Sequence, residues 1–203
     1  MDRRELLKMI ALVTGGAVIG GEFFLTGCKS SGGDVGFTAK NIALLDEVAE
    51  TILPQTTTPG AKAAKVGEFM KVYVTDCYNT RQQEAFYNGI TAIDEASKKM
   101  HGKSFMDATP QQRHDLLISL DAEAREYDKK ITVEEQEQRD QAKREMKEFE
   151  PSPSHYYTMF KQLTLLGFFT SEVGATQALR HVAVPGKYDG AYPYKKGDRA
   201  WAE

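Results

Sequence analysis

The residue best suited to covalent chemistry is Cys28, which ends the run Leu25-Thr26-Gly27-Cys28 after a long apolar stretch. A branched residue and two small residues directly before a cysteine match what a lipoprotein signal peptidase requires, because small side chains fit its narrow cleavage site. The thiol first accepts a diacylglycerol group, and cleavage then leaves this cysteine as the mature N-terminus. The sequence therefore predicts lipidation at Cys28, with anchoring by two or three acyl chains. A buried thiol at the end of a transmembrane anchor is the alternative.

The residues before Cys28 have the plan of an export signal that is later removed. Arg3-Arg4 is followed by Glu5-Leu6-Leu7-Lys8 and by an apolar, glycine-containing stretch from Met9 to Leu25. This start resembles the twin-arginine signal, which exports folded proteins, and an ordinary positively charged secretory signal is the alternative. We predict a cleaved signal over residues 1–27, a lipidated flexible linker over 28–37, and a lipid-anchored protein of the bacterial cell envelope that faces the periplasm.

The rest of the sequence offers no set of side chains that predicts catalysis. The histidines are widely separated, at His101, His114, His155 and His181. The sequence has no Gly-x-Gly-x-x-Gly loop and no Cys-x-x-Cys-His haem-attachment motif. A net charge of −3 over 203 residues argues against nucleic-acid binding, which needs a basic surface. We therefore expect a non-catalytic interaction protein with no metal site and no cofactor in this chain.

Apolar residues recur at spacings of three and four along most of the chain, which predicts amphipathic helices. The predicted helices begin at Thr38, at Ala63, at the capping box Thr80–Gln83, and at the capping box Thr109–Gln112. Cys77 falls on the apolar face of the second helix, so we expect it in the core. The most apolar stretch, Tyr156 to Val173, predicts a central buried helix. The fold class predicted is all-α: a small helical bundle with an extended, ordered, Gly/Pro/Tyr-rich C-terminal tail.

The helical domain is predicted over residues 38–182 and includes a charged segment, residues 121–150, with eleven acidic and seven basic side chains. Charges four residues apart, such as Glu135 and Arg139, predict ion pairs along a solvated helix or helical hairpin. A dedicated docking arm is the alternative interpretation of this segment.

The tail, residues 183–203, has no helical pattern and cannot bury itself in a small bundle without a surface to lie on. Tyr and Trp are enriched among the residues that dominate binding energy at interfaces. The candidate partner-binding residues are Pro185, Gly186, Tyr188, Tyr192, Tyr194 and Trp201. In the alternative interpretation, the tail wraps the helices of its own chain.

Four segments of the chain carry a family resemblance. They are Glu50–Pro54 with Thr58–Lys62, Gly89–Asp94 with Gly102–Phe105, Leu163–Glu172 with Gly174-Ala175, and Val184–Gly190 with Gly197–Trp201. In this order, over about residues 38 to 201, they resemble the gluconate 2-dehydrogenase subunit 3 family. The charged segment departs from the family pattern.

The resemblance implies a small, cofactor-free subunit that helps a catalytic subunit mature and cross the membrane. The implied partner is an FAD-dependent sugar or sugar-acid dehydrogenase of the glucose–methanol–choline type. A c-type cytochrome, which carries haem c, often takes the electrons in such complexes. The alternative function is that of a free-standing envelope lipoprotein that binds a ligand or a protein partner.

Overall fold

The computed structural model describes residues 37–184, 186–187 and 189–202. The predictions for Arg3, Arg4, Cys28, Pro185 and Tyr188 concern residues outside this range. Within the described residues the fold is all-α, as predicted, and no strand is present.

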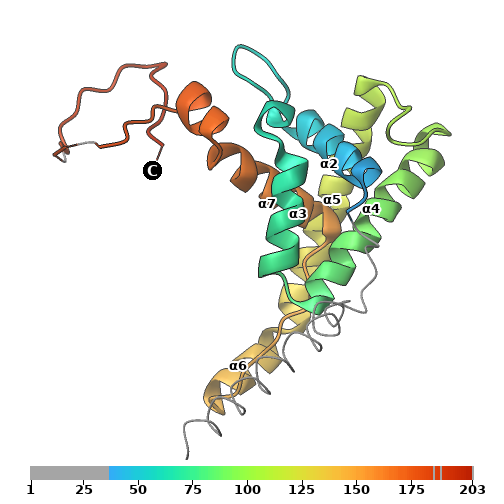
Figure 1. The fold of residues 1–203 in the computed structure, drawn as a ribbon. Coiled ribbons are helices and arrows are strands. Elements are labelled where there is room, and N and C mark those ends of the chain that lie inside the picture. Colours follow the sequence, from blue (N-terminus) through green and yellow to red (C-terminus); the bar gives the residue numbers. More distant parts are fainter. Residues whose placement is uncertain (1–36, 185, 188, 203) are drawn as a thin grey trace, which may run out of the picture. The chain divides into compact units, whose positions relative to one another are not determined.

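The elements follow one another along the chain without long connections up to the end of the charged segment (Figure 1). They are α2 (Ala39–Ile52), the 3-10 turn η1 (Ala61–Ala64), α3 (Val66–Cys77), α4 (Thr80–His101), α5 (Pro110–Glu134), α6 (Gln136–Arg144), α7 (Tyr156–Phe169) and the short π-helix η2 (Gly174–Ala178).

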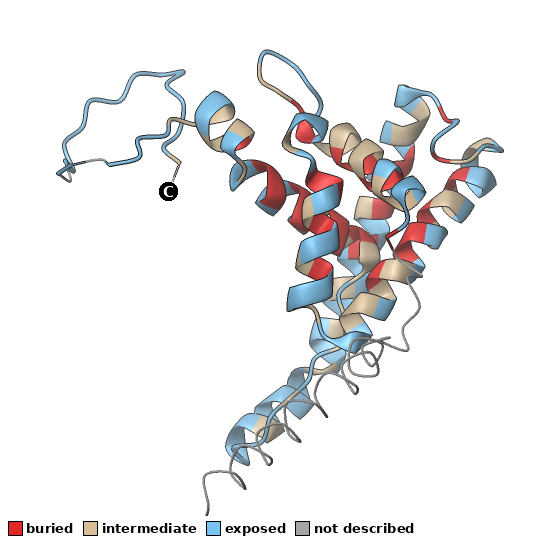
Figure 2. Ribbon diagram, viewed as in Figure 1, coloured by how far each residue is buried: buried red, intermediate tan, exposed pale blue. Residues whose placement is uncertain are grey.

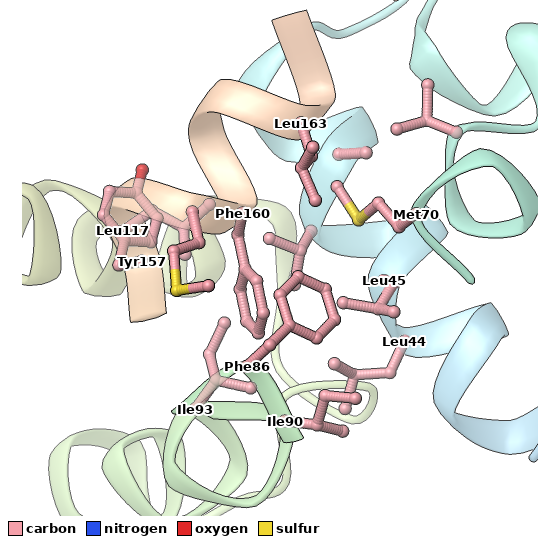
Figure 3. Close-up of a cluster of buried hydrophobic side chains, with 14 of the residues drawn as sticks. Leu44, Leu45, Met70, Phe86, Ile90, Ile93, Leu117, Tyr157, Phe160 and Leu163 are labelled. Carbon is pink, nitrogen blue, oxygen red and sulfur yellow. The ribbon is translucent and has the colours of Figure 1, made fainter. Parts of the chain in front are cut away.

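Helix α7 is the central element of the bundle and contacts α2, α3, α4 and α5. Its Phe160 ring is fully buried and packs edge-on against Phe86 of α4, with ring centroids 4.7 Å apart. Figure 3 shows these two rings surrounded by aliphatic side chains from the neighbouring helices. The predicted central helix is therefore confirmed, although it ends at Phe169 rather than Val173. Among the described residues, no helix is both long enough and apolar enough to cross a membrane.

Two of the predicted helix starts are confirmed at the level of single hydrogen bonds. The Thr38 side chain accepts the N–H of Asn41 and caps α2. Thr109 and Gln112 form a reciprocal capping box with Pro110 at the first helical position of α5. Each cap satisfies an N–H group that has no partner within its helix.

The predicted capping box at the start of α4 is wrong by one residue. Asn79 is the N-cap, and it forms the box with Gln82, while Thr80 is already helical. Both Asn79 and Thr80 are followed three residues later by Gln, so the sequence offers two overlapping boxes. The choice follows from Gln83, whose amide instead donates to carbonyl groups at the end of α3, those of Val74, Thr75 and Tyr78.

Helix α3 ends at Cys77 as predicted, but it differs from its prediction at its start and in the burial of Cys77. Lys65 adopts the left-handed conformation, with φ of 52°, so the helix begins at Val66 rather than Ala63. Cys77, which we predicted in the core, is exposed. The buried residues of α3 are Val66, Gly67, Met70 and Val74. Cys77 shares their face but is the last residue of the helix, and periodicity cannot say whether another element covers a helix end.

The first part of the charged segment belongs to the bundle. Asp121 of α5 forms an ion pair with Lys161 of α7, at 2.6 Å. Asp128 accepts the N–H of His155 at 2.8 Å and the hydroxyl of Thr158 at 2.6 Å. These side chains of α5 therefore hold the N-terminal half of α7 in place.

The later part of the charged segment is the solvated helix that its charges predict. No residue of α6 is buried, and Figure 2 shows this helix almost entirely as exposed. The predicted pair between Glu135 and Arg139 is present, with an N–O distance of 3.6 Å.

His155 caps α7, because its Nδ1 atom accepts the N–H of Tyr157 at 3.3 Å. The imidazole lies between the rings of Tyr127 and Tyr156. Burial lowers the pKa of His155, although the nearby carboxylates of Glu123 and Asp128 oppose that shift. The neutral form, which can accept this hydrogen bond, is therefore favoured.

Candidate partner-binding surface

The first of the four segments that carry the family resemblance is a clamp on the loop after α2. The carboxylate of Glu50 accepts the N–H groups of Gln55 and Lys62, each at 2.8 Å. A Cβ atom at Gly60 would lie 2.2 Å from this carboxylate, so only glycine leaves it enough room. The ammonium group of Lys62 forms an ion pair with Glu47, which lies one helical turn before Glu50 in α2. The segment therefore fixes this loop.

The second segment joins α4 to its neighbours. A Cβ atom at Gly89 would lie 2.4 Å from the Cβ atom of Tyr156, so α4 and the start of α7 make a close contact. Asp94 accepts the N–H of Phe105 at 2.8 Å and pairs with Lys98 at 3.0 Å. Burial acts to raise the pKa of Asp94, but these two partners outweigh it and lower the pKa. This carboxylate is therefore a structural anion that holds the loop after α4.

The third segment packs α7 against α3. A Cβ atom at Gly167 would lie 2.5 Å from the ring of Phe69, and one at Gly174 would lie 1.9 Å from the carbonyl oxygen of Phe168. Three large apolar side chains of this stretch are partly exposed: Leu165, Leu166 and Phe169. Leu166 also lines a hollow of about 220 Å³ between α3, the start of α4 and α7.

The fourth segment is different, because its contacts are mainly within the tail. The backbone of Arg180 pairs with the far end of the tail: its N–H donates to Ala200 at 2.8 Å, and its carbonyl accepts from Ala202 at 2.9 Å. The guanidinium lies over the ring of Trp201, 4.6 Å from its centroid, and 5.6 Å from that of Tyr192. These contacts close residues 180–202 into a loop.

Two further contacts complete this closure. Asp198 lies 3.7 Å from the guanidinium of Arg180. The rings of Tyr192 and Trp201 meet edge to face, with centroids 5.5 Å apart. We call the four side chains Arg180, Tyr192, Asp198 and Trp201 the Arg180 clasp. Arg199 ties the clasp to the end of the bundle by donating to the carbonyls of Thr176 and Gln177.

The predicted partner-binding residues are therefore brought together only in part. Tyr192 and Trp201 meet in the clasp, and their exposed fractions are 52% and 45%. Tyr194 keeps 77% of its surface exposed. Gly186 has a φ of 75°, which glycine adopts readily. Pro185 and Tyr188 lie outside the described residues, and so does Cys28 with the export signal.

Arg180 is the residue that sequence reasoning missed. It precedes Tyr192 by 12 positions and Trp201 by 21, and no helical or strand period links residues so far apart. The available signal was its charge in a segment rich in Tyr and Trp, since arginine commonly stacks on aromatic rings.

Residue types that could bind a metal ion are spread over the described bundle. Among the described residues, no three His, Cys, Asp or Glu side chains are grouped so that they could hold a metal ion. The carboxylates with shifted pKa values are bound to backbone N–H groups or to lysines, as at Asp94 and Asp121. Among the described residues, the tail and the end of α7 both leave large apolar side chains exposed, such as Tyr194 and Phe169.

The family model for gluconate 2-dehydrogenase subunit 3 matches residues 39–186. The chain belongs to this family. Membership in the subunit 3 family indicates an accessory subunit that associates with the catalytic subunit of a dehydrogenase. Comparisons with curated proteins and with solved structures found no significant match.

The family match supports the resemblance drawn from the sequence but ends earlier in the chain. That resemblance ran to about residue 201, whereas the match ends at Gly186 and leaves out most of the tail. The matched range spans the charged segment, and the departure of this segment from the family pattern stays a prediction. The subunit 3 assignment therefore rests on the bundle, in which three of the four segments have clear packing roles.

Proposed function

We propose that this chain is the non-catalytic small subunit of a membrane-associated, FAD-dependent dehydrogenase complex that oxidises a sugar or sugar acid. It assists the export, maturation and stability of a catalytic subunit of the glucose–methanol–choline type. The FAD is bound by that partner, and a c-type cytochrome with haem c accepts the electrons. The observation that carries this proposal is the family match over residues 39–186.

The N-terminal sequence supports a place for the complex in the cell envelope. Arg3-Arg4 fits an export route for folded proteins, and Cys28 fits lipid attachment. A chain without a cofactor of its own gains from such a route when a folded, flavin-loaded partner travels with it. The lipid on Cys28 then holds the complex at the membrane, on the periplasmic side.

The tail supports a contact with the catalytic subunit. Tyr192, Tyr194 and Trp201 keep much of their surface exposed, and aromatic residues of this kind dominate many interfaces once they are buried there. We assign the contact to Pro185, Gly186, Tyr188, Tyr192, Tyr194 and Trp201.

The test is purification of the tagged chain from membranes of its native cell. We expect a flavoprotein dehydrogenase to accompany it, recognised by flavin absorbance and by mass spectrometry of the companion chain. Cys28→Ser should release the complex from the membrane or leave the chain uncleaved with its signal attached, without separating the subunits. Arg3→Lys with Arg4→Lys should leave both subunits in the cytoplasm. A chain that purifies from membranes with no flavoprotein contradicts the proposal and favours the free-standing lipoprotein.

A further inference from the structure

We propose that the Arg180 clasp holds the tail as a preformed basic loop that docks on an acidic surface of the dehydrogenase catalytic subunit. This inference rests on the proposed function, and it adds the chemistry of the partner surface and the residue that prepares the loop for binding.

The charges of the loop point to an acidic partner. The two acidic side chains in its described part are used internally: Asp198 by the clasp and by the N–H of Lys195, and Asp189 by the N–H of Ala191. The side chains of Lys187, Lys195 and Lys196 are exposed. The loop therefore presents positive charge to its surroundings.

This positive charge contrasts with the rest of the protein. Residues 180–203 contain five Lys or Arg and three Asp or Glu, while the whole chain has a net charge of −3. Opposite charges across an interface speed the encounter of partners and select against wrong ones. A basic loop on an acidic body favours a partner that is acidic where the loop binds.

The clasp also lowers the entropic barrier to binding. A loop of this length that is open before binding must lose conformational freedom when it docks. The backbone pairing of Arg180 with Ala200 and Ala202, together with the stacking on Trp201, joins the loop ends before any partner arrives. Tyr194 and the exposed lysines are then displayed from a closed loop.

A second copy of the chain is a less suitable partner. A basic loop placed on the acidic body of another copy makes a head-to-tail contact, and such contacts form open chains unless the rotation closes a ring. The catalytic subunit offers a single defined partner, in keeping with an accessory subunit.

The test measures the affinity of the full-length chain, carrying Cys28→Ser to keep it unlipidated, for the purified catalytic subunit. Lys195→Glu with Lys196→Glu should weaken binding roughly tenfold or more, mainly through slower association, and the loss should shrink at high salt. The matched control is Lys129→Glu with Lys130→Glu on the exposed side of α5, which should bind as the parent chain does.

A second pair of variants tests the clasp itself. Arg180→Lys keeps the charge but loses the planar guanidinium that stacks on the rings. It should weaken binding several-fold while the melting temperature of the isolated chain stays unchanged. Arg125→Lys, at an exposed position of α5, is the control and should change neither property.

The outcomes separate this inference from the proposed function. If the parent chain does not bind the catalytic subunit, the proposed function fails. If the parent binds, and Lys195→Glu with Lys196→Glu binds as tightly as the control variant on α5, the proposal of an acidic docking surface is wrong. The inference is also overturned if charge reversal abolishes only self-association, or only binding to vesicles of phosphatidylcholine and phosphatidylglycerol. If Arg180→Lys binds as the parent does, the clasp does not prepare the loop.

Discussion

Phe160 in α7 and Tyr194 in the tail are both aromatic, yet the first is fully buried and the second keeps 77% of its surface exposed. The glycines show the same contrast. Gly89 has room for no side chain beside Tyr156, whereas Gly197, with a φ of 96°, has no neighbouring atom within 4 Å of an added Cβ. In the bundle, aromatic residues and glycines pack closely together. In the tail, the glycines allow turns of the backbone and the aromatic side chains stay exposed. The bundle therefore stabilises the fold, while the tail leaves aromatic surface exposed.

The largest effect that this comparison predicts is at the centre of the bundle. Phe160→Ala should lower the free energy of unfolding by about 3–5 kcal/mol, because it leaves a cavity beside Phe86. Chemical denaturation of the isolated chain measures this change. Tyr194→Ala is the matched aromatic truncation in the tail and should change stability by less than about 0.5 kcal/mol. Equal losses at the two positions contradict the division between bundle and tail.

A close contact between helices should respond to one added methyl group. Gly89→Ala places a Cβ atom against Tyr156 and should destabilise the chain by about 1–3 kcal/mol, despite the better helix propensity of alanine. Asn88→Ala, at the exposed neighbouring position of the same helix, is the control. It should be neutral or slightly stabilising. A stabilising effect of Gly89→Ala in thermal melts indicates that α4 and α7 can separate without loss.

The cap of α7 predicts a pH dependence that belongs to the bundle. The folded state lowers the pKa of His155 from its ordinary value of 6.5, so the unfolded chain binds more protons between the two pKa values. The stabilising contribution is therefore present above about pH 6.5 and is lost as the pH falls through the lower folded-state pKa. His155→Asn can still cap the helix but does not titrate. Its stability should fall less between about pH 7 and pH 5, and identical slopes for the two proteins contradict the assignment.

The smallest effect on stability is predicted for removal of the tail. Truncation after Val182 removes Tyr192, Tyr194 and Trp201 but leaves the helices from α2 to α7 intact. The isolated chain should unfold within about 0.5 kcal/mol of the parent and retain its helical circular dichroism. Binding to the catalytic subunit should be lost. A stability loss as large as that of Phe160→Ala places the tail on the core of its own chain, and normal melting with normal binding contradicts both interpretations of the tail.

Much of the bundle was determined by local sequence. The all-α class, the caps at Thr38 and Thr109, and the central position of Tyr156–Phe169 follow from periodicity and capping, which act over a few residues. The family assignment also came from the sequence, and it rests on segments whose roles in packing became clear only in three dimensions.

Tertiary structure decided the features that depend on residues far apart in the chain. The overlapping capping boxes at Asn79 and Thr80 were resolved by Gln83, which satisfies the end of a different helix. Cys77 lies on the expected face of α3 but is exposed, because burial depends on which elements cover a helix end. Arg180 gained its role by meeting Trp201 across a loop. Hydrogen bonds within a turn can be predicted from neighbouring residue types, whereas contacts that close a loop or cover a helix end exist only once the whole chain has folded.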